Sequence, residues 1–269
     1  MATSSSHGAL IVFGSGPGIG RHISSLFASR GFHHVVLLSR NPSRLEEDAA
    51  EVKSAAPQAF VSTVPADLSN GESLAGALAQ VDRQLRERGV VVETILFNAA
   101  RVGESDVLTF SVGELEQDFK VGGLIDDAHG IPVFDEKFHL LAVSSLYTVA
   151  QWIIPRFLDM ARGSTQAGYK PTLLVTGGFL HRDPYPPLFS LSAVKAAQYN
   201  LVCTFHKMFR SSGIHCAMIL VGGFVSPEAE RTNPKNIAER AWTLYEQGPD
   251  AREIEIVEPD WESRTKWDN

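Results

Sequence analysis

The polar residues best placed for chemistry follow short apolar runs of the chain. Arg101 comes soon after one such run, and His181, Asp183 and Tyr185 come soon after another. If both runs are strands of one parallel sheet, these residues lie at its carboxyl edge, where ligands of open α/β sheets bind. A histidine or tyrosine there can donate a proton, an arginine can stabilise an oxyanion, and an aspartate can attract a cationic substrate.

The loop that carries three of these residues also has a plainer interpretation. Pro184, Pro186 and Pro187 stiffen the loop, and polar side chains in such a loop often only face water. For each of the residues, chemistry and simple solvation are both open.

The elements that must position these residues follow a regular alternation. Short apolar or β-branched runs are separated by longer helical segments, and they lie at residues 9–13, 35–38, 60–64, 94–97, 172–176 and 214–221, with residues 253–257 as a candidate edge strand. This alternation predicts an α/β fold, a single Rossmann-like, doubly wound parallel sheet with helices on both faces. Asn41-Pro42 and Asn233-Pro234 each join an N-cap residue to a proline, so we expect helices to start there.

Length and charge narrow the classes of partner. A chain of 269 residues that is 44% hydrophobic can bury one large core, so we expect one domain over residues 1–269. The net charge is -7 and Lys and Arg are scattered along the chain, which argues against nucleic acid and against an anionic membrane surface. A small-molecule partner is expected.

Neither the cysteines nor the first residues indicate a secreted or membrane protein. Cys203 and Cys216 match no metal-ligand spacing, and so few thiols fit a reducing compartment, with both side chains expected to be buried. The Ser-rich residues 1–8 lack a basic flank, and the apolar run after them is too short for a signal sequence or a membrane span. We expect a cytoplasmic protein without a metal site.

A glycine-rich turn lies directly between the first predicted strand and a helix. Glycines there allow a tight turn and a close approach of the backbone to a pyrophosphate, while the helix N-terminus offers unpaired N–H groups. Plain turns use glycine too, but the strand-turn-helix context favours a dinucleotide site. The residues expected to hold the dinucleotide here are Gly14, Ser15, Gly16, Gly18, Ile19 and Gly20.

The residues Ser39 and Arg40, after the second predicted strand, favour NADP(H) over NAD(H). An NAD-selective site usually carries an acid at this place for the ribose 2′-hydroxyl, whereas an arginine can pair with a 2′-phosphate. Arg44 either assists or lies on the surface. The alternative is that Arg40 is an ordinary solvated arginine at a helix start.

Three motifs in order resemble those of the short-chain dehydrogenases/reductases. They are the glycines Gly14, Gly18 and Gly20, the segment Ala66-Asp67-Leu68, and the turn Phe97-Asn98-Ala99-Ala100, with Phe13 where the family commonly has threonine. The resemblance implies that the cofactor lies against Asp67 and Leu68 at its adenine and against Asn98, Ala99 and Ala100. Asp67 could instead cap a helix that begins near Ser69, and Asn98 could tie two strands together.

The family resemblance also places the catalytic residues, and there the chain departs from the family. Lys195 matches the lysine that holds the cofactor ribose and lowers the pKa of a catalytic tyrosine. Leu191 stands at the tyrosine and Gly178 at the serine, where with Gly177 it would supply backbone flexibility instead of a hydroxyl. The family's asparagine position falls near Ala142. The chain thus resembles a nicotinamide enzyme without its usual proton donor.

Two further segments differ from the family. The loop Gly222-Gly223-Phe224-Val225-Ser226-Pro227 resembles the proline–glycine loop at the nicotinamide end, which implies that Gly223 and Val225 contact the cofactor, although Pro227 replaces a threonine. Residues 122–142 show neither helical nor strand periodicity. We expect them to be an insertion that interrupts a helix, either a substrate-covering loop or a retained intron.

The resemblance implies an NADP(H)-dependent oxidoreductase that reduces a carbonyl or imine of a small, fairly apolar molecule, and that assembles as a homodimer or homotetramer. Tyr185 or His181 could replace the missing acid, and a cationic iminium needs no acid at all. One alternative is a non-redox enzyme of the cyclase or isomerase type from secondary metabolism. Another is an NADP(H)-binding protein without turnover. Tyr147, Trp152 and Tyr199 are expected in packing or dimer contacts.

Overall fold

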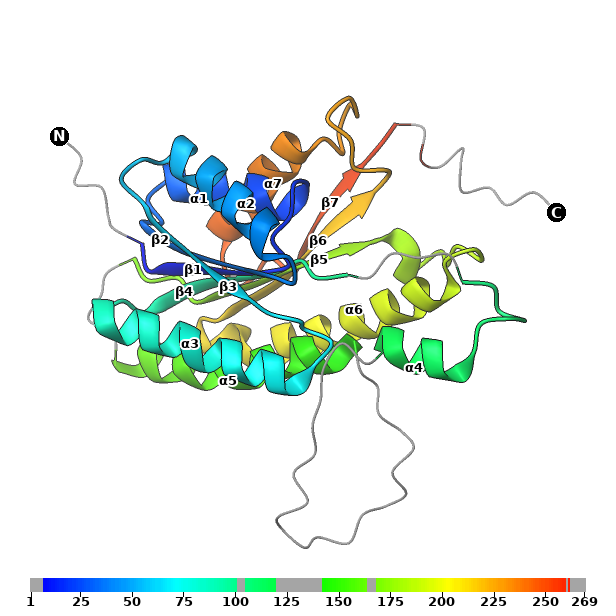
Figure 1. Cartoon of the computed structure of the whole chain (residues 1–269), viewed down its shortest axis with the longest axis horizontal. Coiled ribbons are helices and arrows are strands. Elements are labelled where there is room, and N and C mark those ends of the chain that lie inside the picture. The colour runs from blue at the N-terminus through cyan, green and yellow to red at the C-terminus, as the bar shows by residue number, and fades with distance from the viewer. Residues whose placement is uncertain (1–6, 101–104, 120–141, 164–167, 260, 262–269) are drawn as a thin grey trace, which may run out of the picture.

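A parallel sheet forms the centre of the molecule. The computed structural model describes residues 7–100, 105–119, 142–163, 168–259 and 261. Within these ranges the sheet has seven strands in the order β3-β2-β1-β4-β5-β6-β7, all parallel (Figure 1). The strands are β1 (Ala9–Phe13), β2 (His34–Ser39), β3 (Phe60–Pro65), β4 (Val92–Phe97), β5 (Thr172–Gly178), β6 (His215–Gly222) and β7 (Glu253–Val257).

Helices cover both faces of the sheet, as Figure 1 shows. The helices are α1 (Ile19–Ser29), α2 (Pro42–Ala55), α3 (Gly71–Arg88), α4 (Val112–Phe119), α5 (Ala142–Gly163), α6 (Phe189–Phe209) and α7 (Pro234–Gln247). On one face α1, α2 and α7 pack over β1, and on the other α3, α5 and α6 do so. The predicted α/β fold is confirmed.

Strand β1 is apolar throughout because both of its faces are buried. Ala9, Ile11 and Phe13 belong to the core beneath α3, α5 and α6. Leu10 and Val12 belong to the opposite core, with α1, α2 and α7. Because successive side chains of a strand point to opposite faces, a strand buried on both faces has no polar position.

The expected helix starts are confirmed at two places and corrected at a third. The side chain of Asn41 accepts a hydrogen bond from the backbone N–H of Arg44, and Asn233 caps α7 in the same way. Helix α3, however, begins at Gly71 with Asn70 as its N-cap. Asp67 is therefore not the helix cap, and the interpretation of a helix beginning near Ser69 was wrong by two residues.

The expected insertion at residues 122–142 stays a prediction, because residues 120–141 lie outside the described residues. Helix α4 ends at Phe119 and α5 begins at Ala142. On α5, Tyr147 is 46% exposed, whereas the half-buried Trp152 donates from Nε1 to Asp82 Oδ1 at 3.2 Å. Trp152 therefore packs as expected, and Tyr147 faces outward.

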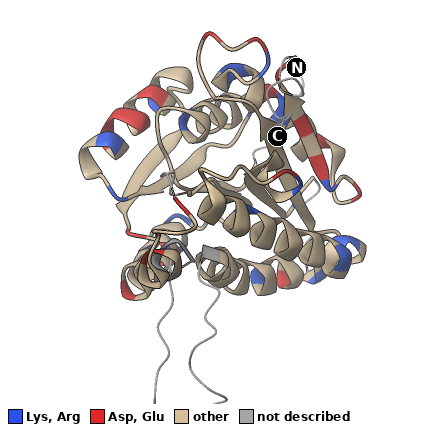
Figure 2. Ribbon diagram, turned by 90° about the vertical axis from the view of Figure 1, so that its right-hand side faces the viewer, with Lys and Arg blue, Asp and Glu red and all other residues tan. Residues whose placement is uncertain are grey.

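Charged residues are scattered over the molecule, and the two cysteines differ in burial. Basic and acidic residues are interspersed over several helices in the view of Figure 2. Cys216 is buried, but Cys203 is only half-buried, which corrects the expectation that both are buried. No helix in the described part of the chain is long and apolar enough to cross a membrane.

A buried carboxylate ties the start of the chain to α7 at the amino edge of the sheet. Glu93, which is 1% exposed, accepts hydrogen bonds from the backbone N–H of Gly8 at 2.6 Å, from His7 Nδ1 at 3.0 Å and from the hydroxyl of Tyr245. Burial, followed by the charge and hydrogen bond of Glu93, raises the pKa of Tyr245, so this hydroxyl stays a donor. This cluster lies at the sheet edge opposite the glycine turn.

Replacing Tyr245 by phenylalanine removes one donor from this buried carboxylate. We expect Tyr245→Phe to lower the free energy of unfolding by about 1–3 kcal/mol, because a buried charged acceptor loses a partner. Urea unfolding followed by circular dichroism measures this change. Tyr147→Phe is the matched control, since Tyr147 is exposed, and an equal, near-zero effect of both substitutions would contradict the account.

Candidate functional site

The glycine turn after β1 is held by close packing on one side and open on the other. Gly14 has a φ of +88°, and a Cβ there would lie 2.6 Å from the backbone nitrogen of Ala99. A Cβ on Gly20 would lie 2.8 Å from the carbonyl oxygen of Gly14. At Gly16 and Gly18 a Cβ would meet nothing within 4 Å. The first pair is therefore needed for packing, and the second pair borders space that a ligand could fill.

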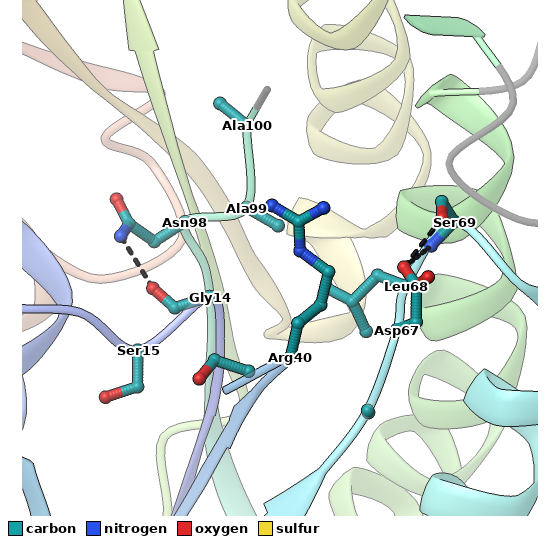
Figure 3. A pocket seen from close by; sticks show the side chains of 11 residues that line it. Gly14, Ser15, Arg40, Asp67, Leu68, Ser69, Asn98, Ala99 and Ala100 are labelled. Carbon is teal, nitrogen blue, oxygen red and sulfur yellow. Dashed lines mark hydrogen bonds between the residues drawn. The ribbon is translucent and has the colours of Figure 1, made fainter. Parts of the chain in front are cut away.

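The side chain of Asn98 connects this turn to the next strands. Its Nδ2 donates to the carbonyl oxygen of Gly14 at 2.9 Å, and its Oδ1 accepts from Thr176 Oγ1 at 2.9 Å (Figure 3 shows the first bond). The carbonyl oxygen of Thr176 in turn accepts from Lys195 Nζ at 3.0 Å. We call these three bonds the Asn98 link. The prediction that Asn98 ties strands together is confirmed.

A hollow of about 570 Å³ opens beside the turn at the carboxyl edge of the sheet. It brings together nucleotide-site residues predicted from four separate parts of the sequence: Gly14, Ser15, Ser39, Arg40, Asp67, Leu68, Asn98, Ala99 and Ala100. Ala66 and Ser69, on either side of Asp67 and Leu68, also line it but were not predicted as site residues. The hollow does not include the other predicted cofactor residues, namely Gly16, Gly18, Ile19, Gly20, Lys195, Gly223 and Val225.

Opposite charges face each other across this hollow. Asp67 Oδ1 accepts from the backbone N–H of Ser69 at 2.9 Å and from its hydroxyl at 2.6 Å. Burial alone would raise the pKa of Asp67, but the bonds from Ser69 and the charge of Arg40 outweigh it and lower the pKa. In Figure 3 the guanidinium of Arg40 extends across the hollow toward Ala99. A cation placed there can pair with a phosphate.

Lys195 lies buried beneath the carboxyl end of β5. Its Nζ donates to the carbonyl oxygen of Thr176 and to Gln198 Oε1, both at 3.0 Å. Burial lowers the pKa of Lys195 to about 8, because the charged form is poorly solvated. An amine with this pKa exchanges a proton easily near neutral pH.

Comparisons with known proteins agree with this geometry. Residues 8–116 match the family model described as the KR domain. A metagenomic short-chain oxidoreductase in complex with NADP has a TM-score of 0.71 at 18% identity, over 95% of this chain and 97% of its own. The chain therefore has the fold of these solved structures, and its residues 8–116 are similar to the KR domain.

Two further solved structures share this fold. A short-chain dehydrogenase from Rhodopseudomonas palustris has a TM-score of 0.70 at 17% identity, over 92% of this chain and 97% of its own. The alcohol dehydrogenase from the archaeon Thermococcus sibiricus, complexed with 5-hydroxy-NADP, has a TM-score of 0.71 at 18% identity, over 94% and 97%. No curated protein matches the sequence.

Gly178, at the predicted serine position, and its neighbour Gly177 lie in regular strand. Gly177 pairs with Leu220 and Gly178 with Val221 across β5 and β6. A Cβ on Gly177 would lie 2.6 Å from Met218 Cε, so a side chain there would have to displace the flexible end of Met218. The expectation of a flexible segment was wrong. Gly178 is extended, and a Cβ there would lie 3.1 Å from the carbonyl oxygen of Val221.

Two of the predicted catalytic side chains lie together in the loop after β5. His181 and Tyr185 line a second hollow of about 410 Å³, mostly apolar, which shares no lining residue with the first. Asp183 lies in the same loop but does not line this hollow, and Arg101 lies outside the described residues. Lys195 lines neither hollow.

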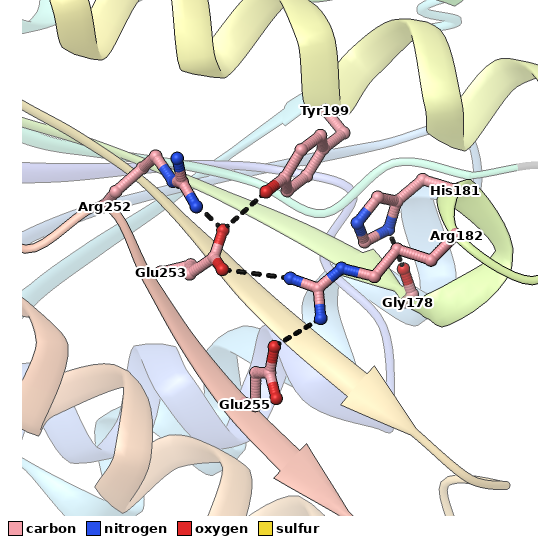
Figure 4. A network of polar contacts seen from close by, with 7 residues as sticks. All are labelled: Gly178, His181, Arg182, Tyr199, Arg252, Glu253 and Glu255. Atoms are coloured by element: carbon pink, nitrogen blue, oxygen red, sulfur yellow. Dashed lines mark hydrogen bonds and ion pairs between the residues drawn. The ribbon is translucent and has the colours of Figure 1, made fainter.

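A polar network beside the second hollow fixes the ring of His181 (Figure 4). His181 donates from Nδ1 to the carbonyl oxygen of Gly178 at 2.7 Å, and its ring stacks on Tyr199 with centroids 3.9 Å apart. Tyr199 donates to Glu253 Oε2 at 2.8 Å, and burial raises the pKa of Tyr199. Tyr199 therefore supports packing, as expected, and is not placed as an acid.

The same loop is attached to the edge strand by one arginine. Arg182 donates to Glu253 Oε1 at 3.0 Å and to Glu255 Oε1 at 2.6 Å, which are neighbours on the same side of β7 (Figure 4). Sequence reasoning missed this pairing because 71 and 73 residues separate the partners. The alternating acids of β7 were the available signal.

The nicotinamide-end loop is attached to the end of β7. Gly223 has a φ of +149°, and a Cβ there would lie 2.7 Å from Glu258 Cγ. Glu258 also accepts from Thr232 Oγ1 at 2.8 Å, while Val225 is 40% exposed. Gly223 is thus required by its contact with Glu258, and neither it nor Val225 reaches the first hollow.

The Asn98 link gives a stability prediction. Asn98→Ala leaves the Gly14 carbonyl and the Thr176 hydroxyl without their partner, so we expect the free energy of unfolding to fall by about 1–3 kcal/mol. Thr176→Val removes one of the same bonds, and the double variant should lose less than the sum of the single losses. Strictly additive losses, measured by urea unfolding, would show that the link does not act as one unit. Asn200→Ala, on the exposed side of α6, is the control.

Proposed function

We propose that the chain is an NADP(H)-dependent oxidoreductase that reduces a carbonyl or imine of a small, fairly apolar molecule. The observation that carries the proposal is the hollow in which the glycine turn, Arg40, Asp67 and Asn98 meet. Two proteins of the same fold support it, since their structures hold NADP and 5-hydroxy-NADP.

The residues present fit a dinucleotide with a 2′-phosphate. The open space at Gly16 and Gly18, next to the N-terminus of α1, suits the diphosphate. Arg40 would pair with the 2′-phosphate, and Asp67 and Leu68 would border the adenine. Lys195 would hold the nicotinamide ribose.

The remaining assignments concern the nicotinamide end. Gly223 and Val225 would border the nicotinamide after a small movement of their loop. When bound, NADPH supplies a hydride to the substrate. The chain's own residues then have to orient the acceptor and provide a proton.

Proton supply is the point at which this chain must differ from its family. Leu191 and Gly178 cannot donate a proton. Lys195 lies one helical turn after Leu191 on α6, and its pKa of about 8 suits proton delivery. His181 and Tyr185 in the apolar hollow are the alternative donors, with Asp183 beside them and Arg101 as a candidate for stabilising an oxyanion.

The missing acid favours an imine over a ketone as the substrate. A positioned acid contributes a factor of about 10² to 10⁴ to proton-coupled steps. A protonated imine already carries the charge that polarises its carbon, so hydride addition to it needs no further proton. The apolar lining of the second hollow fits a small organic molecule.

The residues at positions 191 and 178 also favour a second function. Without Tyr and Ser at positions 191 and 178, the fold could bind a substrate for cyclisation or isomerisation without redox change, or bind NADP(H) without turnover. In either case we also propose a homodimer or homotetramer, with the exposed Tyr147 on α5 as one contact.

Rates with a matched pair of substrates test the proposal. We expect a small cyclic imine to be reduced faster than the ketone of the same size, by about 10²-fold or more, because only the ketone needs the missing acid. The readouts are NADPH absorbance and transfer of deuterium from 4-deuterated NADPH into the product.

Controls separate the alternatives. Lys195→Met should lose turnover, whereas Lys207→Met, at an exposed position of the same helix, should retain it. Equal rates for imine and ketone would contradict the role given to the missing acid. An isomerised product without NADPH consumption would replace the proposal by the non-redox function.

A further inference from the structure

A buried carboxylate lies directly behind the glycine turn. Asp48, on α2, is 0% exposed. Its Oδ2 accepts from Ser15 Oγ at 2.7 Å, and its Oδ1 lies 3.8 Å from Arg21 Nη1, with no hydrogen-bond partner for Oδ1 among the described residues. Asp48 has no part in the proposed reaction.

Ser15 connects this carboxylate to the space proposed for the diphosphate. The residue lines the first hollow, yet its hydroxyl points to α2 instead of into the hollow. The next residue, Gly16, borders the open space. Asp48 is thus one hydrogen bond behind the backbone that would hold the phosphates.

Arg21 contacts both the carboxylate of Asp48 and the glycine turn. Besides its contact with Asp48, Nη2 donates to the carbonyl oxygen of Pro17 at 3.2 Å. The guanidinium therefore lies beside the turn without a close bond to the carboxylate. Removing the negative charge of Asp48 would leave Arg21 available to an anion bound at the turn.

A negative charge in this position opposes a bound diphosphate. Two like charges repel more strongly when little water lies between them, and Asp48 is fully buried. The burial raises the pKa of Asp48, although Ser15, Arg21 and Arg44 each lower it. The other charged neighbour on α2 is Glu47, and β2 and β3 contribute only His34, at the opposite end of the sheet. Helix α1, which packs against α2, also carries His22, whose Nδ1 donates to the carbonyl oxygen of Gly18 at 2.8 Å.

We propose that Asp48 is a positioning residue that sets how tightly the glycine turn holds a diphosphate, weakly when Asp48 is ionised and tightly when it is protonated. This rests on the proposed function, since it assumes that a dinucleotide binds there. The bond from Ser15 to Asp48 keeps the turn in shape in both states. Binding then takes up a proton from solvent onto the Asp48 carboxylate.

The sign of the pH dependence follows from the charges. A bound diphosphate further disfavours the ionised form, so the pKa of Asp48 is higher in the complex than in the free protein. Affinity is therefore greatest below the pKa of the free protein. It falls as pH rises through the interval between the two values and is constant above it.

Calorimetric titration with NAD⁺ tests this, because NAD⁺ lacks the 2′-phosphate that would itself titrate. Asp48→Asn keeps an oxygen for Ser15 but removes the charge. We expect the variant to bind NAD⁺ about threefold to tenfold more tightly than the wild type at pH 7.5. Its affinity should also change less with pH than that of the wild type, which rises toward low pH.

A purely structural role for Asp48 predicts the opposite, since a loosened turn would bind more weakly. Weaker binding by Asp48→Asn, or the same pH slope as the wild type, would overturn the proposal. Glu46→Gln removes an exposed carboxylate from the same helix and should behave as the wild type.

A second measurement needs no variant. Titrating the wild type in buffers of different ionisation enthalpy gives the number of protons taken up on binding, and we expect a positive fraction near the pH at which affinity changes. Binding of NAD⁺ without proton uptake would refute the proposed role of Asp48 but would leave the proposed function unaffected. If the wild type binds neither NAD⁺ nor NADP⁺, the proposed function fails with it.

Discussion

The amide of Asn98 is the contact on which the carboxyl edge of the sheet depends. It accepts one hydrogen bond and donates another, and so fixes the glycine turn after β1 against Thr176 of β5. Thr176 passes the connection on to Lys195 through its carbonyl oxygen. The phosphate end and the catalytic end of the site are therefore held at one spacing by three bonds. A ligand that reaches from one end to the other meets a preformed surface.

The two ends of that surface have diverged to different degrees. At the nucleotide end the packing glycines, Arg40 and Asp67 form a coherent hollow. At the proposed catalytic end, leucine and glycine stand at positions 191 and 178, where the family resemblance implies a tyrosine and a serine. The buried ammonium of Lys195, with a pKa of about 8, is the feature that would keep proton chemistry open. The proposed site would thus join an ordinary nucleotide hollow to an altered catalytic end.

The sequence was sufficient for the elements and much of the nucleotide hollow. Strand periodicity and the Asn-Pro pairs act locally, so each strand and both capped helices could be predicted. The sequence could not decide whether Asp67 caps the next helix, because Asn70 is also a good cap residue. In the structure Asn70 is the N-cap. Gly177 was misread because its pairing with Leu220 joins it to a distant strand, which the local sequence does not indicate.

The contacts that sequence reasoning missed join residues far apart in the chain. Ser15 and Asp48 are 33 positions apart, and Tyr245 and Glu93 are 152 apart. Nothing in the neighbourhood of either acid marks it as buried. The catalytic candidates His181 and Tyr185 were placed in the correct loop, but only the structure shows that His181 is held by stacking on Tyr199.

The central claim is that the chain binds NADP(H) in the first hollow, although leucine and glycine stand at positions 191 and 178. Calorimetric titration of the wild type and of Arg40→Ala with NADP⁺ and NAD⁺ tests it most directly. The account predicts that the wild type prefers NADP⁺ by about tenfold or more, since a charge-assisted hydrogen bond contributes about 1.5–3 kcal/mol, and that Arg40→Ala loses this preference while still binding NAD⁺. Absence of binding by the wild type, or an unchanged preference in Arg40→Ala, would contradict it.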